Sequence, residues 1–131
     1  MVIDTSALLA ILLDEPERRA FNELIEDADA CVISVANLVE SSIVIETRFG
    51  AEGTRDLDLF LERAAIEPVA VDLLHARTAR GAFSRFGKGR HPAALNFGDC
   101  FAYALAVVRG EPLLYKGNDF SHTDVARAKP V

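Results

Sequence analysis

Cysteine is scarce in this chain: only Cys31 and Cys100 occur among 131 residues, and each lies inside an apolar run. Neither belongs to a CxxC pair, and there are too few cysteines and histidines at ligand spacing to build a zinc site. A domain of this length can bury a hydrophobic core without disulfide bonds or structural metals. We therefore expect two buried free thiols in a reducing compartment.

Long apolar runs are also missing. No stretch approaches the ~20 residues that a membrane-spanning helix needs, and the opening segment, Met1 to Asp4, lacks the basic region that begins a signal peptide. Half of the residues are hydrophobic and 26% are charged, which is typical of a soluble globular domain. We expect a cytoplasmic protein that does not enter a membrane.

Acidic residues are absent from one segment of an otherwise acidic chain. The net charge is −6, yet Leu73 to Gly98 contains no Asp or Glu. This segment holds five basic residues: Arg77, Arg80, Arg85, Lys88 and Arg90. Such a distribution suits contact with a phosphate backbone, although a solvated helix face followed by a loop would look the same.

Short apolar strands alternate with longer helical segments along the chain. Strands are predicted at 2–3, 30–33, 68–71 and 113–115, and helices at 7–13, from 16 through 25, at 35–49, around 57–64, at 72–86 and at 97–109. Ser6 and Ser34 are predicted as N-caps of the helices that follow them, and Gly50 as the stop of the helix at 35–49. No repeat or linker interrupts this order. The pattern predicts one α/β domain over residues 1–131, a three-layer sandwich with a short central parallel β-sheet flanked by helices.

Several acids stand where such a sheet would bring them together. Asp4 closes the first predicted strand, Asp119 follows the last, and Glu40 and Asp99 lie in otherwise apolar helices. Ligand sites in open parallel sheets form outside the carboxyl ends of the strands. Clustered carboxylates repel one another unless a hard divalent cation such as Mg²⁺ or Mn²⁺ neutralises them.

Four motifs in this order resemble those of PIN-domain ribonucleases, in particular the VapC toxins of VapBC toxin–antitoxin pairs. They are Met1 to Leu8, with its strand and Asp; Ser34 to Glu40, a Ser with Glu six residues later; Asn96 to Ala104, an Asp that opens an Ala-rich helix; and Leu113 to Phe120. Each motif is weak alone, but together they span nearly the whole chain. One departure is that Tyr115 and Gly117 occupy places where family members often carry a hydroxyl residue and an acid.

The resemblance implies Mg²⁺- or Mn²⁺-dependent hydrolysis of RNA phosphodiester bonds. Asp4 and Asp99 would be the primary metal ligands, Glu40 would hold or deprotonate a water, and Asp119 would complete the rim. The resemblance further implies a VapB-type antitoxin as partner and a homodimer. Helix faces around Phe21 or Phe60 could form the dimer interface, although we favour a position in the core for both phenylalanines.

Supporting contacts to the acids and to the RNA are also predicted. The hydroxyl of Thr5 or Ser6 would donate to a ligand carboxylate or to the substrate phosphate. The basic loop residues Lys88 and Arg90 would contact RNA phosphates.

Two alternative functions remain at this point. A response-regulator receiver domain would use Asp72 as its phosphoacceptor and Lys116 as its lysine, but it would leave Glu40 and Asp99 unexplained and lacks paired acids after the first strand. A catalytically silent PIN-like binding module is the other alternative, favoured by Gly117.

Overall fold

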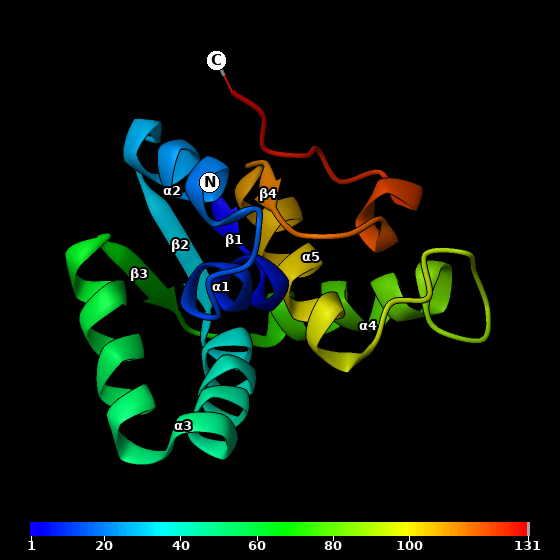
Figure 1. Ribbon diagram of the computed structural model, residues 1–131. Helices are drawn as coiled ribbons and strands as arrows, with labels where there is room; N and C mark the ends of the chain where they lie inside the picture. Colours follow the sequence, from blue (N-terminus) through cyan, green and yellow to red (C-terminus); the bar gives the residue numbers. More distant parts are fainter. Residues whose placement is uncertain (131) are drawn as a thin grey trace.

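A computed structural model describes residues 1–130 (Figure 1). The elements follow the order β1 (Val2–Ile3), α1 (Thr5–Leu12), α2 (Arg18–Asp27), β2 (Cys31–Ser34), α3 (Val35–Arg63), β3 (Ile66–Val69), α4 (Leu73–Phe86), α5 (Phe97–Arg109), β4 (Leu113–Leu114) and the 3₁₀ helix η1 (Asp119–His122). The strands form one parallel sheet in the order β3-β2-β1-β4.

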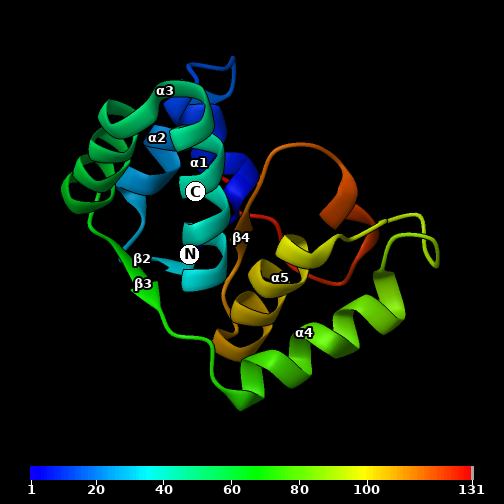
Figure 2. The same cartoon turned by 90° about the horizontal axis from the view of Figure 1, so that it is seen from below.

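The sheet separates two hydrophobic clusters. On one face, α1, α2 and α3 pack against strand residues that include Ile3 and Ile33. On the other face, α4 and α5 pack against Val2, Val32 and Leu113 (Figures 1 and 2). Neighbouring strand residues point to opposite faces, so each strand contributes to both clusters. The predicted three-layer α/β sandwich is confirmed.

The first helix begins earlier than its sequence suggested. Asp4, and not Ser6, is the N-cap of α1, because its carboxylate accepts a hydrogen bond from the Ser6 backbone N–H. The N-cap predicted at Ser34 is confirmed: its hydroxyl accepts from Ala36 N. Gly50 adopts a left-handed φ of +67° and breaks α3 into two helical arms, as its predicted role as a helix stop requires.

Asp72 lies at the start of α4, after β3 at the edge of the sheet. Its carboxylate accepts a hydrogen bond from the backbone N–H of His75, which makes it the N-cap of this helix. The residue therefore has a helix-capping role, and the phosphoacceptor role of a receiver domain gains no support from its position.

The segment after β4 covers the outer edge of the sheet. The backbone N–H of Leu113 donates to Ala126 O, and the N–H of Ala128 donates back to Leu113 O. The opposite edge strand, β3, contains Pro68, which has no N–H to offer. No helix within residues 1–130 is long and apolar enough to span a membrane.

Candidate active site

Asp4 occupies the carboxyl end of β1, at the centre of the sheet, and is 2% exposed. Its Oδ2 accepts hydrogen bonds from the Ser6 backbone N–H at 3.0 Å and from Ser6 Oγ at 2.5 Å. Its Oδ1 is buried and receives no hydrogen bond from any residue within 1–130. Burial raises the pKa of Asp4 to about 7, and the charges of Asp99 and Glu40 add to the rise.

Asp99 lies in the first turn of α5, where Gly98 and Asp99 follow the N-cap residue Asn96. Asn96 Oδ1 accepts from the Asp99 N–H at 2.9 Å, and Asp99 Oδ2 accepts from the Asn96 N–H at 3.0 Å, a reciprocal capping box. Burial raises the pKa of Asp99 to about 6, helped by the charges of Asp119 and Glu40. One carboxylate oxygen, Oδ1, has no part in the capping box.

Glu40 and Asp119 complete the cluster. Glu40 packs directly on the start of α5: a Cβ on Gly98 would lie only 2.1 Å from Glu40 Oε2. Asp119 is exposed in η1, close enough for its charge to raise the pKa of Asp99. The structure thus brings the four predicted acids close enough for their charges to interact, and we call Asp4, Glu40, Asp99 and Asp119 the acid group. Within residues 1–130, however, no three His, Cys, Asp or Glu side chains are arranged closely enough to enclose a metal ion as they stand.

The two supporting hydroxyls point in different directions. Ser6 Oγ donates to Asp4 Oδ2 and accepts from the Lys116 backbone N–H at 2.9 Å, as predicted for a residue that holds a ligand carboxylate. Thr5 is buried, and its Oγ1 instead accepts from Asn37 Nδ2 at 3.1 Å. Of the two hydroxyls predicted as alternatives, Ser6 therefore makes the contact with a carboxylate and Thr5 does not.

Asn37 is a site residue that the sequence analysis missed. It is fully buried, and its Nδ2 also donates to Gly98 O at 3.0 Å, which joins α3 to the start of α5. The side chain therefore fixes the segment that carries Asp99 relative to the helix that carries Glu40. An Asn in an otherwise apolar helix was the available signal, since buried amides normally have hydrogen-bond partners.

Lys116, the candidate receiver lysine, follows β4 but does not approach Asp72. Its Nζ pairs with Glu15 and Glu17 in the segment between α1 and α2, and this raises the pKa of Lys116. Next to it, Gly117 has a φ of +90°, which an L side chain rarely adopts. The position where family members often carry an acid is thus a sharp turn in this chain.

The predicted RNA contacts, Lys88 and Arg90, lie in the exposed loop between α4 and α5. Arg90 stacks over the ring of Phe83 with its guanidinium carbon 5.4 Å from the ring centroid. Neither basic residue is among the charges that shift the pKa of Asp4 or Asp99. Phe21 is buried and Phe60 packs against the same core, as favoured from the sequence.

Comparisons with known proteins agree with this architecture. The family model of the PIN domain matches residues 1–126. The chain is 53% identical over 126 residues to ribonuclease VapC30 of Mycobacterium tuberculosis, covering 96% of both proteins. It is 56% identical over 126 residues to ribonuclease VapC of Mycolicibacterium smegmatis, covering 96% of this chain and 98% of that protein.

Two solved structures share the fold at low sequence identity. The crystal structure of Mycobacterium tuberculosis VapC20, a toxin that cleaves the sarcin–ricin loop, has a TM-score of 0.79 at 16% identity and covers 98% of both chains. The structure of VapBC2 from Rickettsia felis, bound to a promoter DNA fragment, has a TM-score of 0.74 at 16% identity and covers 96% of this chain and 94% of that one. These likenesses show a common fold, and the family match excludes the receiver alternative. The chain belongs to the PIN-domain family and, within it, to the VapC ribonucleases.

Proposed function

We propose that this VapC ribonuclease hydrolyses RNA phosphodiester bonds with Mg²⁺ or Mn²⁺ held by Asp4 and Asp99. One observation carries the proposal: two buried or half-buried carboxylates with raised pKa values share one group with Glu40 and Asp119. Keeping several carboxylates in a dry site is costly unless a cation neutralises them. The comparisons support the ribonuclease, and the electrostatics of the acids support the cation.

The donor set fits a hard cation. Asp4 Oδ1 is buried without a hydrogen-bond donor, and Asp99 Oδ1 takes no part in the capping box. Mg²⁺ is commonly bound through one or two protein carboxylates and keeps several of its waters, so it needs no enclosing cage of three side chains. When bound, it would lower the pKa of a water and offset the negative charge of the phosphate.

The chain's own groups then have separate tasks. Glu40, held against Gly98, accepts a proton from the attacking water while the water oxygen forms its bond to phosphorus. The bond to the leaving oxygen breaks, and that oxygen takes a proton from solvent water. Asp119 limits the open side of the site from η1. Ser6 holds Asp4 Oδ2, which leaves Oδ1 without a hydrogen bond among the described residues. Asn37 keeps the start of α5 against α3.

The direct test is cleavage of a mixed RNA pool with and without Mn²⁺. We expect cleavage by the wild-type chain with Mn²⁺, none in EDTA, and a loss of at least about a hundredfold in Asp99→Ala, as removal of a group that stabilises the reaction typically gives. Asp72→Asn is the matched control, because Asn also caps helices well and Asp72 lies outside the acid group. Mn²⁺ binding with no turnover on any RNA would instead identify a silent PIN-like binding module.

Lys88 and Arg90 provide the proposed contacts to RNA phosphates. Both are exposed, and neither forms an ion pair among the described residues. Changing both to Gln should weaken RNA binding uniformly across sequences and reduce the slope of log K against log salt concentration by about 1 per lost contact. An unchanged affinity and slope would remove these two residues from the RNA interface.

We further propose a VapB-type antitoxin and a second copy of the chain as protein partners. Structures that share the fold include a toxin–antitoxin complex and a VapBC2 complex, which supports the antitoxin as partner. A basic side chain of the antitoxin is the chemistry that the acid group would accept. Val39 and Ile43, one turn apart on α3, are 57% and 59% exposed and provide an apolar patch for a homodimer. Light scattering of wild type and of Ile43→Glu tests the dimer, which should become a monomer in the variant.

A further inference from the structure

A groove of about 380 Å³ lies between α4 and α5, outside the acid group. Its lining consists of three aromatic rings (Phe83, Phe97 and Phe101), Cys100, two alanines and Arg80. Binding pockets for small planar ligands have this composition, mostly apolar and aromatic with a few polar groups. The groove is therefore a candidate site for a flat, partly apolar group.

Phe97 is the most exposed large apolar side chain in the described chain, at 78%. A T-shaped contact with Phe101, with ring centroids 4.9 Å apart, fixes the orientation of its ring. Across the groove, Phe83 is 39% exposed and carries the Arg90 guanidinium over its ring. An oriented, solvent-facing ring is a platform on which another planar group can stack.

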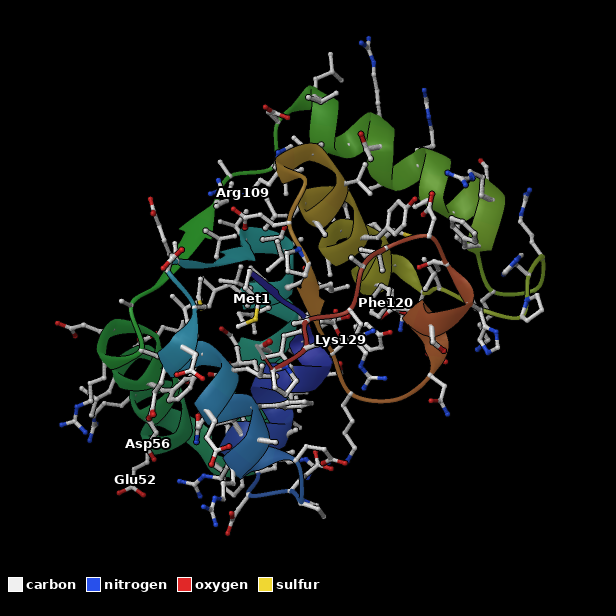
Figure 3. The ribbon with its side chains drawn as sticks, turned by 90° about the horizontal axis from the view of Figure 1, so that it is seen from above. Met1, Glu52, Asp56, Arg109, Phe120 and Lys129 are labelled. Carbon is white, nitrogen blue, oxygen red and sulfur yellow. The ribbon has the colours of Figure 1, made fainter. Side chains whose placement is uncertain are left out.

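Arg80 is the only charged residue among those that line the groove, so the lining carries a positive charge and no carboxylate. Arg77 and Arg80, three residues apart on α4, and Lys88 in the following loop form no ion pair among the described residues. Figure 3 shows long, nitrogen-tipped side chains that point outward from α4. Aromatic rings between unpaired cations are the combination that holds single-stranded nucleic acid, whose bases stack while its phosphates meet the charges.

The groove and the proposed active site share the first turn of α5. Phe97 directly precedes Gly98, which packs on Glu40, and lies two residues before Asp99. A phosphate bound at the acids therefore has a neighbouring nucleotide within reach of the start of α5.

We propose that the α4–α5 groove binds an unpaired base of single-stranded RNA next to the phosphodiester that is cleaved, with Arg80 and Arg90 on the flanking phosphates. This inference rests on the proposed nuclease function and adds a subsite for substrate selection to it. A second copy of the chain fits less well, because a two-fold contact would place the same cationic segment against itself.

The test measures RNA binding in EDTA, where cleavage is absent. Short oligoribonucleotides carry the fluorescent base 2-aminopurine at successive positions, and the full wild-type chain should quench it at one position through stacking. Phe97→Ala should abolish that quenching and weaken binding at least about fivefold. Phe97→Leu, which keeps an apolar side chain of similar size, should lose the quenching as well, and Arg80→Gln should weaken binding while the remaining complex still quenches.

Matched controls come from the second arm of α3, where Figure 3 labels Glu52 and Asp56 away from α4. Leu59→Ala removes a side chain as exposed as Phe83, at 39%, and Arg55→Gln removes an exposed arginine of that arm. Neither should change affinity or quenching. Circular dichroism and thermal melting should be unchanged in Phe97→Ala, given how little of this residue is buried.

Two results would overturn the inference. One is RNA affinity and quenching that are equal in wild type and Phe97→Ala. The other is a change from dimer to monomer in Phe97→Ala at unchanged RNA affinity, which would assign the groove to a second copy. Failure of the nuclease proposal looks different: wild type would bind and quench as described here yet cleave no RNA when Mn²⁺ is added.

Discussion

Replacing Asp4 by Asn should stabilise the protein in the absence of divalent cations, and the gain should grow with pH. The pKa of Asp4 is raised from 3.8 to about 7, chiefly by burial. The folded state therefore keeps a proton that the unfolded state has already released between these two values. Below pH 3.8 the carboxyl is protonated in both states and does not lower the free energy of unfolding. As pH rises from 3.8 through 7, the free energy of unfolding falls, because only the unfolded state releases the proton easily. Asn carries no charge at any of these pH values.

The size of the effect follows from 1.36 kcal/mol per pKa unit. The full shift corresponds to about 4 kcal/mol above pH 7, and about 2.5 kcal/mol of it develops between pH 5 and pH 8. The new amide has its own burial cost, but that cost is the same at both pH values. The free energy of unfolding of Asp4→Asn minus that of wild type should therefore increase by about 2.5 kcal/mol from pH 5 to pH 8.

Urea denaturation in EDTA at the two pH values measures this difference. Asp58→Asn, at an exposed position on α3, is the control and should follow the wild type at both. Adding Mn²⁺ at pH 8 should stabilise the wild type and leave Asp4→Asn unchanged, because only the wild type offers the carboxylate. A difference between Asp4→Asn and wild type that stays constant from pH 5 to pH 8 would refute the electrostatic argument.

Three further changes probe the positioning of the acids. Gly98→Ala places a Cβ 2.1 Å from Glu40 Oε2, so the carboxylate must move and Mn²⁺-dependent cleavage should fall at least about tenfold. The control, Gly81→Ala, meets nothing within 4 Å and should be neutral or stabilise α4 by up to about 1 kcal/mol in urea denaturation. Equal cleavage by both variants would contradict this prediction. Asn37→Ala leaves Gly98 O without its donor and should lower the free energy of unfolding by about 2 kcal/mol. A loss below about 0.5 kcal/mol would contradict the role given to this hydrogen bond. Ser6→Ala removes the hydroxyl that lowers the Asp4 pKa, so that pKa, followed by NMR titration in EDTA, should rise.

The sequence predicted most elements because each depends on local pattern. Ser34 as a cap and Gly50 as a stop are properties of single residues and their neighbours, and both hold in the structure. The acid group was predictable for a similar reason: parallel strands end on one side, so Asp4 and the residues after β4 had to meet there. Amphipathic spacing was enough to place the helices on both faces.

What could not be predicted depends on pairing between distant segments. The third strand runs over Ile66–Val69 and not 68–71, because its register is set by Cys31↔Ile66 and Ser34↔Val69, and no local signal contains that pairing. Asn37 acquires its role only through a carbonyl 61 residues further along the chain. The N-cap is Asp4 and not Ser6, because α1 begins directly after β1. The sequence of so short a strand does not show where the strand ends and the helix begins.

The tail that pairs with Leu113 has a consequence for how this molecule associates with others. The segment around Arg127 is hydrogen-bonded along β4, and β3 contains a proline. Within residues 1–130, neither edge strand therefore offers an unbroken row of free backbone donors and acceptors to a strand of another molecule. Partners must therefore come through side chains on the helices. Deleting the last residues from 126 onward would expose the β4 margin, and copies of the shortened chain would then be able to join strand to strand and aggregate.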